Sequence, residues 1–247
     1  MYLKKIKIYN YRQLQDITLD FQRNLTVLAG PNNSGKTTLI SVLKGVLHDK
    51  NFKLSYSDIP THLSIDWIDK VFSIFQTVIT GNDKEKGIAK ILEGLSEDDN
   101  FKDNFVIPKF KVKIQVDYNK EADDIQIFAD YIMDLDENKN SFYFVYQFEP
   151  SINSFEKLLN EHYDKVKLKF ESIAKDDCKE KDAKLYSIRE SLLKIYCASL
   201  QEKTYFSNES FENLNVINVA DYKNLFHFKN IQALRELDDV ENDVSQG

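Results

Sequence analysis

Alternating hydrophobic and polar residues mark the strands that the sequence predicts. Apolar side chains occupy every second position over residues 6–8 and 17–21, which predicts two half-buried strands paired as a hairpin. Residues 110–118 alternate strictly, and residues 141–149 form a further alternating run with one aromatic face. The short apolar run 25–29 is followed by a glycine and is typical of a buried strand.

A second pattern, with apolar residues three or four positions apart, predicts helices between these strands. It begins at Lys36 and continues to residue 47. Residues 154–202 repeat it over a long charged stretch, which we interpret as two helices separated near residues 175–184. Further patterns fit helices over 65–79 and 125–135 and, more weakly, strands over 214–219 and 225–228. Strands interleaved with helices predict the α/β class.

Composition narrows the class of protein. The 247 residues are 42% hydrophobic and 30% charged, which is enough apolar material for a sizeable core and argues against a disordered or fibrous chain. Two cysteines without a CxxC motif indicate a reducing compartment, so we expect a cytoplasmic protein. No run of 18 apolar residues occurs, so we expect no membrane partner.

The net charge of −7 hides an uneven distribution of charge along the chain. Residues 1–53 contain nine lysines and arginines but three acidic residues, whereas the remainder is acidic. Three of the seven glycines, Gly30, Gly35 and Gly45, fall in this basic segment. Glycine gathers where a backbone bends sharply or approaches a ligand closely, so the segment is the first place to look for a site.

The motif that carries chemistry lies in the basic segment, where residues 30–37 read GPNNSGKT. It matches the phosphate-binding loop G-x-x-x-x-G-K-[ST] and stands between a predicted strand and a predicted helix, as such a loop requires. The turn's backbone N–H groups would form an anion site at the positive end of the helix. Lys36 would act as the catalytic cation on the β- and γ-phosphates, and the Thr37 hydroxyl suits a metal such as Mg2+. The expected nucleotide-binding residues of this loop are Gly30, Pro31, Asn32, Asn33, Ser34, Gly35, Lys36, Thr37 and Thr38.

Residues 2–47, which include Asn10-Tyr11-Arg12 and the loop with Asn32, resemble the opening of ABC-type ATPases of the RecF, SMC and OLD (overcoming lysogenization defect) group. The resemblance is more diffuse over residues 110–149, and residues 228–235 look like the strand that leads OLD-like ATPases into their second half. It implies a P-loop NTPase fold, the first lobe of an ABC-type ATPase, with a mixed β-sheet around the P-loop helix and a helical insertion. It also implies that Arg12 contacts a nucleotide phosphate.

The same resemblance implies a domain organisation. Residues 1–150 would form the core sheet and the phosphate loop, residues 151–204 a helical insertion, and residues 205–247 return strands and an acidic C-terminal end. The second lobe in this group carries a signature loop with Gly-Gly and a strand of four apolar residues followed by Asp-Glu, and neither string occurs here. The group also has a glutamine after a strand of the first lobe, for which Gln115 and Gln147 are candidates, although ordinary strand positions explain both.

The resemblance finally implies a function. ATP and Mg2+ would be the cofactors of one ATPase lobe, completed in a homo-oligomer or by a partner subunit that carries the second lobe. The implied setting is DNA repair or antiphage defence, with DNA and a nuclease domain as candidate partners. An alternative stays open, a non-catalytic interaction subunit that uses ATP as a structural ligand and residues 154–202 as its partner surface. A GTPase fits less well because the Asn-Lys-x-Asp string is absent, and four arginines are few for the lid of a small-molecule kinase.

Overall fold

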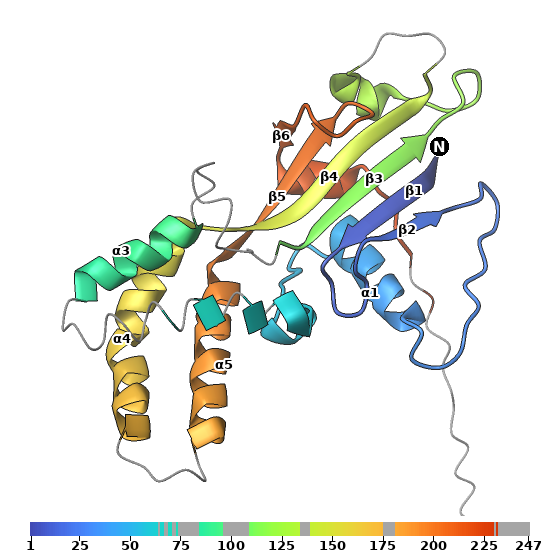
Figure 1. Ribbon diagram of the computed structural model, residues 1–247. Helices are drawn as coiled ribbons and strands as arrows, with labels where there is room; N and C mark the ends of the chain where they lie inside the picture. The colour runs from blue at the N-terminus through green and yellow to red at the C-terminus, as the bar shows by residue number, and fades with distance from the viewer. Residues whose placement is uncertain are drawn as a thin grey trace, which may run out of the picture.

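The computed structural model describes residues 1–63, 65–66, 69–70, 73, 84–95, 109–133, 139–174, 181–229 and 231. Its strands form one sheet in the order β2-β1-β3-β4-β5-β6, and the pairings among them are antiparallel (Figure 1). The strands are β1 Tyr2–Tyr9, β2 Ile17–Asp20, β3 Lys111–Asp117, β4 Ser141–Pro150, β5 Leu200–Ser207 and β6 Asn215–Ile217. The α/β class is confirmed, with antiparallel pairings where a mixed sheet was expected.

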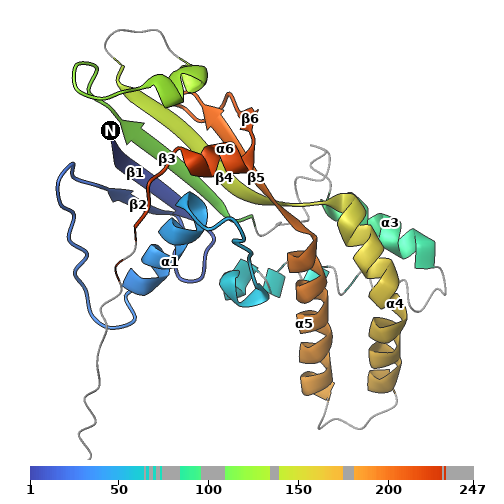
Figure 2. The same ribbon diagram turned by 180° about the vertical axis from the view of Figure 1, so that it is seen from behind.

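One face of this sheet carries the main hydrophobic core. The side chains of β1, β3 and β4 that alternate onto it, such as Ile6, Ile114 and Phe144, are completely buried. Helix α1 (Lys36–Leu47) and the short helix α6 (Val219–Asn224) cover this face, as Figure 2 shows. Phe144 lies edge-on to four other aromatic rings, with ring centroids 5.9 to 6.1 Å apart. Such edge-to-face contacts add to the stability that burial alone provides.

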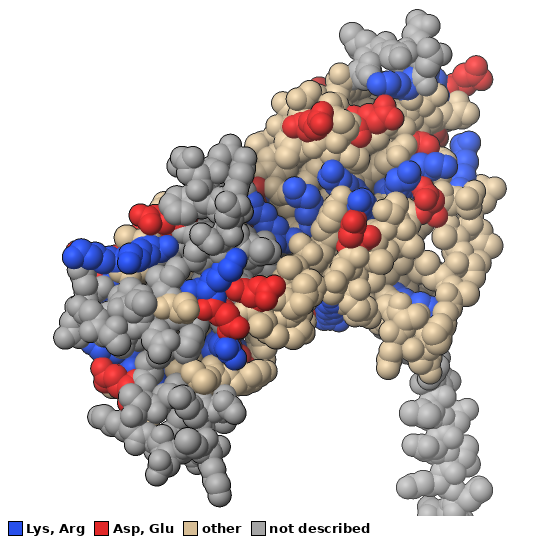
Figure 3. Space-filling view, viewed as in Figure 1, with Lys and Arg blue, Asp and Glu red and all other residues tan. Residues whose placement is uncertain are grey.

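The opposite face of the sheet is rich in lysine. Lys5 and Lys7 of β1 and Lys111 and Lys113 of β3 alternate with the core residues, so they stand on the other side of the sheet. Basic side chains gather over the strands on this side (Figure 3). The sheet therefore separates α1, which follows the phosphate-loop motif, from a polar and basic surface.

Two long helices form a separate structure that we call the helical arm. Strand β4 leads into α4 (Ile152–Ala174), and α5 (Lys181–Ser199) returns beside it and continues into β5 (Figure 1). Helix α3 (Lys84–Leu95) packs against α4. The arm has its own hydrophobic cluster, which includes Phe155, Leu159, Ile188, Leu192 and Tyr196. The two helices predicted within residues 154–202 are thus confirmed.

The run 25–29 does not form the buried strand that its composition predicts. It belongs to none of the described strands, and Leu25 and Val27 are 72% and 75% exposed. Burial would need a second layer against the run, and the described part of the chain supplies none there. A short apolar run does not show whether another part of the chain packs against it, and that packing decides whether the run is buried.

The structure differs from the sequence predictions at two other places. The predicted helix 125–135 is a shorter 3-10 helix, η3 (Gln126–Tyr131), because Phe128 turns into the core and Ile132 returns to extended backbone. The strand predicted within 214–219 is confirmed as β6, whereas the one at 225–228 is wrong. There α6 ends, and Phe226 packs against the Tyr222 ring with centroids 5.1 Å apart.

Some sequence expectations fall on residues that the structure does not describe. The helix predicted over 65–79 lies partly outside the described residues, and those of its residues that are described are helical. The break predicted near 175–184 lies mostly outside, as do the strand suggested at 228–235 and the acidic C-terminal end. The domain boundaries at 150 and 204 stay a prediction.

Candidate nucleotide-binding site

Residues 30–35 form a largely exposed turn in front of α1. The backbone N–H of Ser34 donates to the carbonyl of Pro31 at 3.3 Å. Asn33 and Gly35 both have positive φ, 63° and 89°. Gly35 is the N-cap of α1 and has no side chain that could cap the helix, so the N-cap position supplies no acceptor to the first N–H groups. Successive amides in such a turn form a concave nest, and at a helix N-terminus the nest attracts anions.

Lys36 bends back over this turn. Its Nζ donates to the carbonyl oxygens of Gly30 and Pro31, each at 2.7 Å, and lies 3.3 Å from Ser34 Oγ. These contacts tie the ammonium to the turn whose amides form the nest. An anion bound there would contact both the amides and the lysine. It would compete with the two carbonyl oxygens for the lysine ammonium.

The two threonines of the loop have different surroundings. Thr37 is exposed, whereas Thr38 is buried and its Oγ1 accepts a hydrogen bond from Gln13 Nε2 at 3.2 Å. The hydroxyl of Thr37 is therefore open to a metal ion or a phosphate, while that of Thr38 already has a partner. Asn32 and Asn33 are also exposed. Sequence reasoning missed Gln13, whose only signal is its place beside Asn10-Tyr11-Arg12.

The turn from Tyr11 to Leu14 packs against the start of α1. Tyr11 and Leu14 exchange backbone hydrogen bonds of 3.0 and 2.7 Å, and the Tyr11 ring is buried in the core. A Cβ on Gly35 would lie 3.3 Å from both Leu14 Cδ2 and Gln13 Nε2. A glycine at position 35 thus allows both the left-handed backbone and the close approach of this turn. The structure brings the Arg12 turn and the phosphate loop together.

Arg12 is held by an acidic residue that the sequence analysis did not select. Its Nε donates to Asp58 Oδ1 at 2.8 Å, and its backbone N–H donates to the Asp58 carbonyl at 2.7 Å. Asp58 ends the short helix η1 (Tyr56–Asp58), which begins at Ser55 with a capping box. The hydrogen bond with Asp58 raises the pKa of the Arg12 guanidinium. The spacing Ser55-x-x-Asp58 is a capping signal that could have marked this element.

Gln115 and Gln147 do not join the loop. Gln115 Nε2 donates to Asp117 Oδ1 at 2.9 Å and to Ser141 Oγ at 3.2 Å, which are contacts within the sheet. Gln147 lies between Tyr146 and Phe148, which point into the core shared with α1, so its own side chain is on the opposite face. Their contacts and placement support the ordinary strand reading for both.

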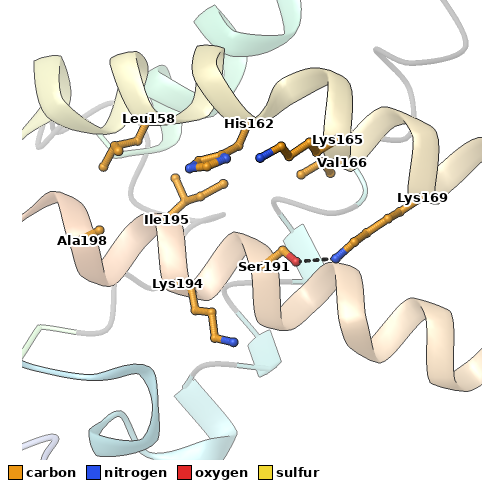
Figure 4. Close-up of a pocket in the computed structure, with 9 residues that line it drawn as sticks. All are labelled: Leu158, His162, Lys165, Val166, Lys169, Ser191, Lys194, Ile195 and Ala198. Atoms are coloured by element: carbon orange, nitrogen blue, oxygen red, sulfur yellow. Dashed lines mark hydrogen bonds between the residues drawn. The ribbon is translucent and has the colours of Figure 1, made fainter.

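A separate cavity of about 400 Å³ lies between the helices of the arm (Figure 4). Its walls are apolar at Leu158, Val166 and Ile195, and His162 and Lys165 point into it from α4. Both helices are regular there, so the cavity offers no glycine-rich turn and no free helix N-terminus. Of the two places, the turn before α1 therefore has the geometry that is typical of an anion site, and this cavity does not.

The described residues also limit how a metal ion could be bound. Among them, no group of three or more histidine, cysteine, aspartate or glutamate side chains could hold a metal. Mg2+ prefers oxygen ligands and often combines one or two protein groups with substrate phosphates and water. The exposed hydroxyl of Thr37 fits this mode, in which the nucleotide supplies most of the ligands.

Comparison with known proteins agrees with this geometry. A family model described as an AAA ATPase domain matches residues 1–246. The chain belongs to this family. The match extends over the sheet, the phosphate loop and the helical arm, and with it the P-loop NTPase type of fold expected from the sequence is confirmed.

Curated relatives match part of the chain. The chromosome partition protein Smc of Mycoplasma genitalium is 37% identical over 54 residues, which are 22% of this chain and 6% of that protein. The DNA replication and repair protein RecF of Psychromonas ingrahamii is 29% identical over 85 residues, 33% of this chain and 22% of that protein. The matches thus span between 6% and 22% of the length of these relatives. The likeness of this AAA ATPase domain to the RecF and SMC group is confirmed.

A helix that crosses a membrane needs about 20 predominantly apolar residues. None that the described residues form has the length and apolar character to cross a membrane.

Proposed function

We propose that this chain is the ATP-binding lobe of a RecF/SMC-type ATPase and that it holds ATP with Mg2+ at residues 30–38. The observation that carries the proposal is the turn before α1, where Asn33 and Gly35 are left-handed and no side chain caps the helix. Lys36 lies on the same turn. Amides, a helix N-terminus and a mobile ammonium are the groups that bind a triphosphate.

Different residues of the loop would contact the phosphates and the metal ion. Lys36 would exchange the carbonyls of Gly30 and Pro31 for the β- and γ-phosphates, and Thr37 would contribute an oxygen to Mg2+. Bound Mg2+ would neutralise phosphate charge, and catalysis by such sites is mostly positioning and charge stabilisation. Arg12, in the turn that packs against Gly35, would supply a further positive charge.

Hydrolysis would require more than this chain. The expected Gly-Gly signature and Asp-Glu strand are absent from the sequence, so we expect slow or no turnover by the chain alone. A second copy or a partner subunit would complete the site, with two ATP molecules between two subunits. We place this ATPase in the cytoplasm, in DNA repair or antiphage defence, with DNA and a nuclease domain as candidate partners. The name of the RecF relative supports the repair setting, and the likeness to OLD-like ATPases suggests defence.

The binding of ATP with Mg2+ to the whole chain tests the proposal. Lys36→Ala should weaken it by about 10- to 100-fold, since charged hydrogen bonds contribute about 1.5–3 kcal/mol. Lys44→Ala is the matched control, because it removes an exposed lysine from the same helix α1. Equal affinity of Lys36→Ala and the unmodified chain would refute the assignment. Thr37→Ala should abolish the gain in affinity from Mg2+, and Thr37→Ser should keep it.

The alternative function, an interaction subunit with ATP as a structural ligand, is favoured by one observation. The arm exposes a cavity with apolar walls and inward-pointing basic side chains, which suits a partner surface (Figure 4). The two proposals differ in turnover. ATP hydrolysis that appears when the product of a neighbouring gene is added would support the ATPase, and ATP binding without turnover in the same mixture would support the interaction subunit.

A further inference from the structure

Arg12 is fixed at two points by one residue. Its backbone N–H and its Nε both bind Asp58, at 2.7 and 2.8 Å, across 46 positions of sequence. Arg12 itself has a left-handed backbone, with φ of 49°, which few residues other than glycine adopt readily. The contact with Asp58 therefore sets both the backbone and the side chain of Arg12.

This arrangement leaves part of the guanidinium for a ligand. A guanidinium has five N–H donors, one on Nε and four on the two Nη atoms. In the part of the chain that the structure describes, its hydrogen bond to Asp58 uses Nε, and the Arg12 side chain remains 44% exposed. Gln13, the next residue, contacts Thr38 of α1. The guanidinium also lies over the Tyr11 ring, with Cζ 5.3 Å from the ring centroid, and its Nη groups belong to the turn that packs against the phosphate loop.

Asp58 is well suited to hold this orientation. Its side chain is 7% exposed, and its Oδ2 accepts the backbone N–H of Ser55 at 2.8 Å while Oδ1 accepts Arg12. Both carboxylate oxygens are therefore bonded. A buried carboxylate with fixed partners cannot turn away without leaving a charge unpaired in a poorly solvated place.

The helix η1 that carries Asp58 also contacts the helical arm. Lys194 of α5 lies over the Tyr56 ring, with Nζ 5.0 Å from its centroid, and forms an ion pair with Glu190 at 2.8 Å. Hydrogen bonds from Lys194 and Tyr56 lower the pKa of Glu190. Lys194 is also one of the residues that line the cavity between α4 and α5 (Figure 4). Ile59, the residue after η1, is buried in the hydrophobic cluster of the arm, and a cavity of about 500 Å³ lies beside Tyr56 and Lys194.

We propose that Asp58 is a positioning residue of the nucleotide site, which orients the Nη groups of Arg12 toward the bound phosphates. Through Tyr56, the orientation of Arg12 is also coupled to the arm. The inference rests on the proposed function, because it requires ATP at the loop 30–38. Asp58 touches no phosphate itself. Asp58 changes the affinity for ATP by way of Arg12, and α5 changes it by way of η1.

A double-mutant cycle tests the first step. The affinity of the whole chain for ATP with Mg2+ is measured for Asp58→Asn, Arg12→Ala and both together. Asp58→Asn keeps the shape and one acceptor, and we expect about tenfold weaker binding. In the Arg12→Ala chain, the same change should weaken binding less than twofold. Asp16→Asn is the matched control, since Asp16 pairs with Lys7 at 2.8 Å on the same segment, and should change nothing.

Two results would overturn the role of Asp58. One is an unchanged affinity in Asp58→Asn, and the other is a loss that persists in full without Arg12. Thermal unfolding of each variant identifies one that fails to fold. A failure of the proposed function looks different, because then the unmodified chain binds no ATP or Lys36→Ala binds it equally well.

A variant that leaves the Arg12–Asp58 pair in place tests the second step. Tyr56 is 37% exposed, so Tyr56→Ala should fold, and we expect about threefold weaker ATP binding. The loss should disappear in the Arg12→Ala chain. Unchanged binding in Tyr56→Ala, or a loss that does not depend on Arg12, would show that the arm has no part in positioning Arg12. This test remains available if Asp58→Asn does not fold.

Discussion

The two hydrophobic clusters of the molecule are assembled in different ways. The sheet cluster combines residues from distant parts of the chain, from Ile6 of β1 to Tyr222 of α6, and the phosphate loop leads directly into its helix α1. The arm cluster lies mostly between Phe155 and Tyr196, within one helical hairpin. The nucleotide site therefore depends on long-range packing in the sheet, whereas the arm is a local structure attached beside it.

Among the described residues, a few link the two clusters. Leu200, where α5 passes into β5, packs against both. Ile59, directly after η1, is buried in the arm cluster, and Tyr56 of η1 contacts Lys194 of α5. Damage to the sheet cluster should therefore remove the nucleotide site, while damage to the arm should reach it only weakly. The predictions that follow test this difference, from the largest expected effect to the smallest.

Phe144→Ala should have the largest effect. The ring is completely buried and has four aromatic neighbours, so its removal should destabilise the fold by about 3–5 kcal/mol. Urea unfolding gives the loss of stability, and ATP binding should fall with the folded fraction. The control is Tyr186→Ala, which removes a ring that is 67% exposed and should change stability by less than about 0.5 kcal/mol. A small loss in Phe144→Ala would contradict the central place of the sheet cluster.

Leu192→Ala makes the corresponding change in the arm. This side chain is 1% exposed in the arm cluster, so we expect a loss of about 2–5 kcal/mol, detected by hydrogen exchange in α4 and α5. ATP affinity of the folded chain should stay within about threefold, because the loop is built on the other cluster. Leu168→Ala, at a side chain that is 65% exposed, is the matched control. Complete loss of ATP binding in Leu192→Ala would show that the two clusters form one cooperative unit.

Gly45→Ala should destabilise the helix that follows the phosphate loop. A Cβ at this position would lie 2.5 to 2.7 Å from atoms of the Phe52 ring, which is packed among other core rings. Overpacking of this kind costs about 1–3 kcal/mol, more than the ~1 kcal/mol that alanine adds to helix propensity. We expect a net loss of about 1 kcal/mol in urea unfolding. A gain in stability would mean that Phe52 moves aside freely.

The smallest expected effect on stability concerns the thiol of Cys197, which lines the cavity between η1 and the arm. Burial, together with the charge of Asp58, raises its pKa to about 12. Because the thiolate is the reactive form, alkylation in a Cys178→Ser chain at pH 8 should be at least about 100-fold slower when folded than when unfolded. The rate should rise with pH up to about pH 12. This thiol should leave stability unchanged well below its ordinary pKa of 9.0, and should lower stability as the pH rises from there toward 12. Fast alkylation at pH 8 would indicate that the contact between η1 and the arm opens readily.

Much of the fold could be predicted because it follows from local pattern. Strict alternation over 110–118 and 141–149 specified β3 and β4, since the two faces of a strand differ in burial at every second residue. Helical spacing specified α1, α4 and α5. Prediction failed for 25–29 and 225–228, where a short apolar run has the same composition whether or not another layer covers it.

By itself, the sequence determined the phosphate loop, because a glycine turn, a lysine and a helix start lie within eight consecutive residues. It also determined the likeness to the RecF and SMC group. Only the tertiary structure decided that Gln13 bonds Thr38 and that Asp58 holds Arg12, pairs that are 25 and 46 positions apart. Contacts at such separations depend on how the sheet, α1 and η1 pack together, and no local pattern of residues encodes that packing.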